Sequence, residues 1–242
     1  MLKENERIDS LQRNGYSIIQ DSTRFCFGMD AVLLTEFVKI KKNDNVLDLC
    51  TGTGVIPILL EAKTEGGHFT GVEIQEEVAD MAQRSVELNK IGGKVEIINK
   101  DLRRLDEIFP GNTFDVVTVN PPYMAVNNAL TNPDESKAIA RHEIKCTLED
   151  VLKQSARVLK SNGRFYMVHK PDRLGEIIVR MKANGLEPKR LRIVYPRVES
   201  DPNMILIEGL KGGNRGMKVE KPLIIYDENG VYMPEVSKIY EE

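Results

Sequence analysis

Short apolar runs alternate with longer amphipathic segments along the middle of the chain. Residues 75–89 show the helical pattern, because Val78, Ala82 and Val86 recur every four positions. The short runs are rich in β-branched residues, which is typical of buried strands. The pattern predicts strands at 46–50, 68–73, 94–99, 114–119 and 164–169. It predicts helices at 31–38, 55–62 and 75–89, a helix from residue 147 that stops at Asn162-Gly163, and a helix from Pro171 that ends near Asn184-Gly185. This alternation predicts an α/β fold with a mostly parallel sheet and helices on both faces.

The two ends of the chain depart from this alternation. Ahead of the first helix, residues 17–19 and 24–27 are compatible with two short strands. Beyond the last helix, 186–195 and 204–210 alternate in polarity and predict antiparallel edge strands. We therefore divide the chain into an N-terminal extension (1–44), a main domain (45–210) and a small C-terminal appendage (211–242).

Composition places the chain among ordinary globular proteins. It has 242 residues, of which 41% are hydrophobic and 29% charged, enough for one large domain. No apolar run approaches the roughly 18 residues of a membrane span, and the first residues lack the apolar stretch of a signal peptide. We therefore expect a cytoplasmic protein. The three cysteines and three histidines show no metal-ligand spacing, so neither a metal site nor a disulfide is expected.

Charge is distributed unevenly. The net charge is −3, which argues against a generally basic nucleic-acid binder, yet residues 180–221 hold ten Lys/Arg against five Asp/Glu. Two interpretations stay open for this segment: a solvated face of the protein, or a local patch that binds phosphates.

The first candidate site follows the strand predicted at 46–50. Asp48 precedes Gly52 and Gly54, whose backbone can pass close to a ligand, and Glu73 ends the next strand, where a carboxylate can accept from ribose hydroxyls. A dinucleotide site would require a third glycine where this chain has Pro57, and Asp48 would repel a phosphate but attract an ammonium group. The residues favour a cationic, ribose-bearing cofactor without phosphates, such as S-adenosylmethionine.

Asp101 follows the third predicted strand and has two possible roles. Its carboxylate can accept a hydrogen bond from the exocyclic amine of the cofactor's adenine. It can equally cap the segment that begins at Leu102.

The second candidate site is the run Asn120-Pro121-Pro122-Tyr123, which closes the strand predicted at 114–119. The prolines impose a rigid, extended exit from the strand. The Asn120 side-chain oxygen and the Pro121 carbonyl can accept both N–H bonds of a planar amino group, and Tyr123 can stack on a flipped base. Such acceptors favour the positive charge that develops on nitrogen during transfer, so neither His142 nor Glu143 is required as a base.

These motifs, in this order, resemble the class I S-adenosylmethionine-dependent methyltransferases. Four segments together are similar to bacterial tRNA(Val) adenine-N6 methyltransferases. They are the tetrad at 120–123, Phe27-Gly28-Met29-Asp30-Ala31, Arg141-His142-Glu143 and Gly209-Leu210-Lys211-Gly212-Gly213. The resemblance implies a Rossmann-like, mostly parallel seven-stranded sheet with one antiparallel strand, tRNA as the nucleic-acid partner, no membrane and no metal, and an extension at 1–44 packed on the cofactor site. It implies catalysis by Asn120, Pro121, Pro122 and Tyr123, and S-adenosylmethionine binding by Asp30, Asp48, Cys50, Thr51, Gly52, Gly54, Glu73, Ile74, Asp101 and Leu102.

Three other functions stay open. A protein glutamine-N5 methyltransferase of the release-factor type also acts on a planar amide, but that family has a longer N-terminal region than the roughly 45 residues found here. An rRNA guanine-N2 methyltransferase would use the same tetrad. A non-catalytic nucleotide-binding assembly factor would not need it. We also expect the polar stretch 124–146 to fold over the substrate.

Overall fold

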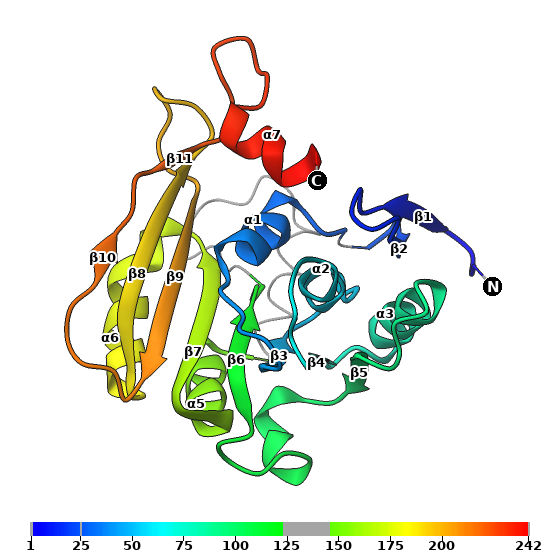
Figure 1. Cartoon of the computed structure of the whole chain (residues 1–242), viewed down its shortest axis with the longest axis horizontal. Coiled ribbons are helices and arrows are strands. Elements are labelled where there is room, and N and C mark those ends of the chain that lie inside the picture. Colours follow the sequence, from blue (N-terminus) through cyan, green and yellow to red (C-terminus); the bar gives the residue numbers. More distant parts are fainter. Residues whose placement is uncertain (1, 25, 123–145, 242) are drawn as a thin grey trace.

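The computed structural model describes residues 2–24, 26–122 and 146–241, and its centre is one twisted sheet (Figure 1). The strand order is β10-β8-β9-β7-β6-β3-β4-β5, and β11 also pairs with β8. The bounds are β3 Asn45–Leu49, β4 His68–Glu73, β5 Val95–Asn99, β6 Phe114–Val119, β7 Leu159–His169, β8 Leu186–Tyr195, β9 Met204–Lys211, β10 Lys218–Val219 and β11 Leu223–Ile224.

Only β9 runs against its neighbours in this sheet, since it pairs antiparallel with both β7 and β8. The predicted α/β class, with a mostly parallel sheet and one antiparallel strand, is confirmed. The predicted strand number is wrong: the described sheet has nine strands, not seven, because the two-residue strands β10 and β11 add to β8. For the same reason β8 is not the edge strand that its alternating pattern predicted. The edge position predicted for 204–210 is also wrong, because β9 lies between β7 and β8.

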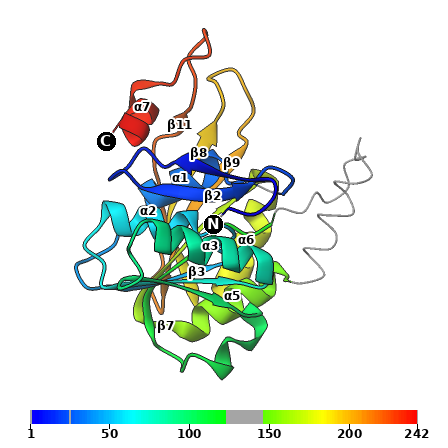
Figure 2. The ribbon, with the colours of Figure 1, turned by 90° about the vertical axis from the view of Figure 1, so that its right-hand side faces the viewer.

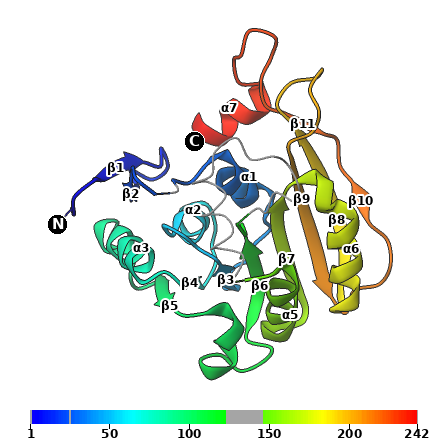
Figure 3. The same ribbon diagram turned by 180° about the vertical axis from the view of Figure 1, so that it is seen from behind.

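Helices cover both faces of the sheet, as predicted (Figures 1 and 3). One face carries α1 (Met29–Phe37), α2 (Val55–Lys63) and α3 (Glu76–Leu88), and the other carries η1 (Leu102–Glu107), α5 (Leu148–Val158), η2 (Pro171–Arg173) and α6 (Leu174–Ala183). Alternate residues of one strand supply the two cores: Val46 packs with α1 and α2, whereas Leu47 packs with α5 and α6. The period of two in a pleated strand causes this division.

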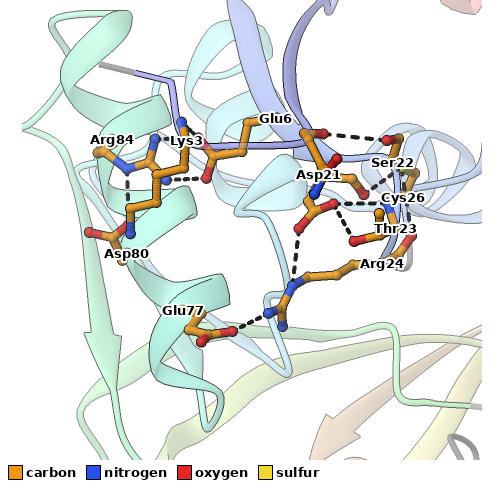
Figure 4. Close-up of polar contacts among 11 residues, drawn as sticks. Lys3, Glu6, Asp21, Ser22, Thr23, Arg24, Cys26, Glu77, Asp80 and Arg84 are labelled. Carbon is orange, nitrogen blue, oxygen red and sulfur yellow. Dashed lines mark hydrogen bonds and ion pairs between the residues drawn. The ribbon is translucent and has the colours of Figure 1, made fainter.

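A separate hairpin of β1 (Glu6–Ser10) and β2 (Ser17–Asp21) lies against α3 (Figure 2). Ion pairs hold it there: Arg84 contacts Glu6 at 2.6 Å, Lys3 contacts Asp80 at 2.7 Å, and Arg24 pairs with Glu77 (Figure 4). The strand predicted at 17–19 is therefore present. The strand predicted at 24–27 is wrong for the residues described there. The strand β2 pairs with β1, which comes before it in the chain, and not with a strand that follows it.

The helix that begins after Thr147 is shorter than predicted. Thr147 forms the predicted capping box with Asp150. However, α5 ends at Val158 instead of continuing to Asn162-Gly163. The backbone N–H groups of Asn112 and Thr113 bond to the carbonyls of Arg157 and Val158, which turns the chain into β7.

The C-terminal residues return to the start of the main fold. After β11 the chain enters α7 (Pro234–Glu241), which packs against α1 (Figure 1). None of the helices in the described part of the chain combines the length and apolarity that a bilayer crossing needs. Tyr123, the Arg141-His142-Glu143 motif and nearly all of the predicted substrate loop at 124–146 lie outside the described residues.

Candidate functional site

Three neighbouring strands bring the two predicted sites to one edge of the sheet. In the register, Leu49 of β3 pairs with Val72 of β4 and with Val119 of β6. Glu73, Cys50 and Asn120 each come next in the chain, so they stand side by side where these parallel strands end. Since neighbouring strands are about 4.8 Å apart, the backbones of Glu73 and Asn120 are roughly 10 Å apart across β3. This is the edge at which ligands bind in open α/β sheets.

The loop after β3 turns through left-handed backbone conformations. Cys50, Gly52 and Gly54 have φ angles of 56°, 57° and 81°. A Cβ on Gly54 would lie 3.2 Å from Cβ of Ala82, so the glycine allows α3 to pack closely against this loop. A Cβ on Gly52 would meet nothing within 4 Å, which leaves its backbone open to a ligand.

Asp48 is buried beneath this loop, with 1% of its surface exposed. Its Oδ1 accepts a hydrogen bond from the Thr118 hydroxyl at 2.6 Å, while Oδ2 is buried without a hydrogen-bond partner among the described residues. Burial raises the pKa of the Asp48 carboxyl to about 7, although the neighbouring hydroxyls of Thr118 and Thr51 act in the opposite direction. A buried acceptor without a partner fits a cationic ligand group that donates hydrogen bonds.

Glu73 ties the loop to the next strand. Its Oε2 accepts from the backbone N–H of Gly52 at 3.0 Å, and its Oε1 accepts from the backbone N–H of Gln75 at 3.0 Å. Oε1 also accepts from Nε2 of Gln75 at 3.3 Å, a long hydrogen bond that a ribose hydroxyl can replace. Oε2 has a second lone pair that remains available to a ribose hydroxyl. The residue types and positions therefore fit a nucleoside beside the glycine loop.

Asn120 contacts a residue from the N-terminal segment. Its Nδ2 donates to Oδ2 of Asp30, in the first turn of α1, at 2.9 Å. Pro121 is buried and Pro122 is exposed, so the chain leaves the sheet edge at this point. The structure thus places Asp30 beside the predicted acceptor, 90 residues away in sequence.

The remaining predicted cofactor residues lie around the same edge. Asp101 caps η1: it accepts from the backbone N–H of Arg103 at 2.9 Å, and the Arg103 side chain holds the pKa of its carboxyl below the usual range. The capping role is therefore present, and the adenine contact stays a prediction. Leu102 is buried and Ile74 is half-buried.

Cys50 meets a residue that the sequence did not connect with it. The neighbouring Cys146 thiol, together with burial, raises the pKa of the Cys50 thiol well above its ordinary value. All three cysteines are free thiols. The described residues contain no group of three or more His, Cys, Asp and Glu side chains that could hold a metal ion.

Two residues of the site, Thr118 and Gln75, were not predicted from the sequence. Thr118, which bonds Asp48, is a polar residue within an apolar strand, and that contrast was a usable signal. Gln75 offered no signal of its own. Several cations of the basic segment 180–221 form ion pairs with carboxylates, including Arg180 with Glu149 and Arg192 with Glu235, which favours the solvated-face interpretation.

Comparisons with known proteins identify a family and a fold. The sequence model of a family described as "Methyltransferase domain" matches residues 40–209. The protein named tRNA1(Val) (adenine(37)-N6)-methyltransferase from Bacteroides fragilis strain YCH46 is 26% identical over 192 residues, covering 79% of this chain and 80% of that protein. The protein of the same name from Porphyromonas gingivalis strain ATCC 33277 is 25% identical over 234 residues, covering 93% of this chain and 91% of that protein.

Solved structures share the fold. Protein Atu636 from Agrobacterium tumefaciens, described as a predicted O-methyltransferase, superposes with a TM-score of 0.71 at 23% identity, covering 88% of this chain and 95% of that chain. Geranyl diphosphate C-methyltransferase from Streptomyces coelicolor A3(2), solved with S-adenosyl-L-homocysteine, gives a TM-score of 0.57 at 14% identity, covering 76% of this chain and 78% of that chain. At these identities the likeness shows the fold alone.

Proposed function

Because the chain belongs to the methyltransferase domain family, we propose that it transfers a methyl group from S-adenosylmethionine to adenine N6 in tRNA. The chain is an S-adenosylmethionine-dependent N-methyltransferase; the adenine and the tRNA are the proposed part. The main support is the position of Asn120 and Pro121 at the end of β6, one strand away from the glycine loop of β3. The relatives named as tRNA adenine-N6 methyltransferases support the choice of substrate.

In this proposal the residues at the ends of β3, β4 and β5 hold the cofactor. Asp48 faces its ammonium group, the backbone at Cys50, Thr51, Gly52 and Gly54 lies beneath its methionine part, and Glu73 accepts from its ribose. Ile74, Asp101 and Leu102 lie around its adenine. S-adenosylmethionine supplies a methyl group on a positively charged sulfur when it is bound.

The residues after β6 act on the substrate. An aromatic amino nitrogen is a weak nucleophile, because its lone pair is delocalised into the ring. Asn120 Oδ1 and the Pro121 carbonyl accept its two N–H bonds, which increases electron density on nitrogen and aims the lone pair at the methyl group. The same acceptors stabilise the positive charge that forms on nitrogen in the transition state. The nitrogen then loses a proton to solvent, and Tyr123 holds the base by stacking.

Incubation of the protein with S-adenosylmethionine and a tRNA1(Val) transcript is expected to produce N6-methyladenosine, detected by mass spectrometry of the digested RNA. The matched control is the same transcript with guanine at position 37, which is expected to stay unmodified. Labelled methyl in a protein substrate would support the glutamine-N5 function instead, and N2-methylguanosine in rRNA the guanine-N2 function. We place the proposed reaction in the cytoplasm, the compartment in which tRNA works.

The raised pKa of Asp48 predicts that cofactor affinity depends on pH. An ammonium group binds the ionised carboxylate, and a group with a pKa of about 7 is mostly protonated at pH 5.5. Affinity for S-adenosylmethionine is therefore expected to rise roughly 15-fold from pH 5.5 to pH 7, with release of a proton. This window lies below the pKa of about 7.7 at which α-amino groups lose their own proton.

Calorimetry in two buffers of different ionisation enthalpy measures both the affinity and the released proton. Asp48→Asn is the control, since its affinity is expected to be lower and independent of pH. An affinity of the unaltered protein that stays constant from pH 5.5 to pH 7 would contradict the contact between Asp48 and the ammonium group.

A further inference from the structure

The first turn of α1 is bonded to the strand end that carries the candidate acceptors. Oδ2 of Asp30 accepts from Nδ2 of Asn120 at 2.9 Å, and Oδ1 of Asp30 accepts from the backbone N–H of Ala31 at 2.9 Å. One carboxylate oxygen is therefore fixed by the helix N-terminus, where negative charge is favoured, and the other by the Asn120 amide.

Gly28 makes room for this carboxylate. A Cβ at position 28 would lie 3.0 Å from Oδ1 of Asp30, closer than ordinary van der Waals contact. A larger residue would push the carboxylate away from Asn120. The segment Phe27-Gly28-Met29-Asp30 thus has a local physical reason for its glycine.

The chemistry of the two groups sets the orientation of the amide. An asparagine side chain can present either its oxygen or its NH2 to a neighbour, whereas a carboxylate only accepts hydrogen bonds. Asp30 therefore keeps the NH2 of Asn120 toward itself and turns Oδ1 to the opposite side. The negative charge of Asp30 also polarises the Asn120 amide, so that Asn120 Oδ1 becomes a stronger hydrogen-bond acceptor on the side opposite Asp30.

We propose that Asp30 is a positioning residue for methyl transfer, which holds the Asn120 amide so that Oδ1 faces the amino nitrogen of the substrate. This role rests on the proposed function, and it differs from the cofactor-binding role that the sequence resemblance implies for Asp30. Asp30 precedes residue 40, where the family match begins. Tyr240 of α7 is close by: burial, with Tyr232, Tyr226 and Asp30 nearby, raises the pKa of its phenol to about 12.

Steady-state kinetics with tRNA, together with calorimetry of cofactor binding, test this role. Asp30→Ala is expected to lower kcat by about 10- to 100-fold, the usual cost of removing a partner that orients a functional group, while the Kd for S-adenosylmethionine stays within about twofold. Asp30→Asn keeps an accepting carbonyl and is expected to recover most of the lost kcat. Gly28→Ala, which leaves both functional groups intact, is expected to lower kcat several-fold.

Glu36→Gln is the matched control, because Glu36 lies on the same helix but pairs with Lys63 at the surface. Its kcat and Kd are expected to stay unchanged. An unchanged kcat in Asp30→Ala, or a weakened Kd with normal kcat at saturating cofactor, would overturn the positioning role, and the second result would establish a cofactor contact.

Side-chain amide NMR separates this inference from the proposed function, because it needs no substrate. One Hδ2 resonance of Asn120 is expected to be shifted downfield by the carboxylate in the unaltered protein and to lose that shift in Asp30→Ala. If the protein fails to methylate tRNA but shows this shift, the adenine assignment fails and the orientation of Asn120 stands. If the shift is missing in the unaltered protein, the positioning role is wrong whatever the substrate.

Discussion

Replacement of Asn120 by alanine is expected to lower kcat by about 10²–10³-fold, the cost of removing one preorganised acceptor from a transition state. The substitution removes Oδ1, which accepts from the amino group, and leaves Asp30 without the hydrogen bond that joins it to the end of β6. The Kd for S-adenosylmethionine is expected to change little, since the proposed cofactor contacts come from the ends of β3, β4 and β5 and not from β6. Single-turnover methylation of tRNA and calorimetry of cofactor binding measure the two effects separately.

The variant Asn120→Asp provides the comparison. It keeps an oxygen acceptor but places a second carboxyl group against Asp30, and two carboxylates this close raise the pKa of one of them. Its kcat is therefore expected to lie between those of the unaltered protein and Asn120→Ala, and to vary with pH. Full turnover by Asn120→Ala would rule out the role of this side chain in transfer.

Replacement of Glu73 by alanine is expected to weaken S-adenosylmethionine binding by roughly 10²–10⁴-fold, or about 3–6 kcal/mol, because two charge-assisted hydrogen bonds to the ribose are lost at about 1.5–3 kcal/mol each. Removal of the carboxylate also leaves the Gly52 N–H without its 3.0 Å acceptor, so the glycine loop is held less firmly. Calorimetric titration with S-adenosylmethionine gives the Kd directly. At saturating cofactor, kcat is expected to return to near its normal value.

Two variants complete this test. Glu73→Gln keeps the side-chain volume and one accepting oxygen, but it replaces the other oxygen by an NH2 group that cannot accept a hydrogen bond. Its affinity for S-adenosylmethionine is therefore expected to fall between those of the unaltered protein and Glu73→Ala. Glu76→Gln changes an exposed carboxylate three residues away and is expected to bind normally. An unaltered Kd in Glu73→Ala would remove Glu73 from the cofactor site.

Sequence periodicity predicted the central strands well and the terminal ones poorly. The strands at 68–73 and 114–119 were predicted to the residue, because buried apolar runs are bounded there by polar or turn-forming residues. In contrast, β1 consists of Glu6-Arg7-Ile8-Asp9-Ser10 and is held to α3 largely by ion pairs, so no apolar period marks it. The strands β10 and β11 have two residues each, too few for any period to appear.

The candidate site shows a similar limit. Glu73 and Asn120 were recognised because each ends or follows an apolar run, a position that places a polar side chain at the sheet edge. Asp48 was recognised because it is a carboxylate inside an apolar run just before the glycine loop. Their partners depend on which strands and helices become neighbours. Thr118 meets Asp48 only because β6 pairs with β3 in this register, and Asp30 reaches Asn120 only through the packing of α1. Local sequence contains neither fact.

The pairing of β10 and β11 with β8 has a consequence for self-association. The outermost long strand of an open sheet presents unpaired amide groups to which a strand of another chain can add. Here the tail of the same chain occupies that position: the backbone N–H groups of Glu220 and Ile225 bond to the carbonyls of Leu191 and Tyr195. Nearer its start, β8 contains Pro188, which has no N–H to donate, and a register shift between Pro188 and Arg190. Tail and proline together leave fewer backbone groups of β8 available for a strand of another chain on this side of the sheet.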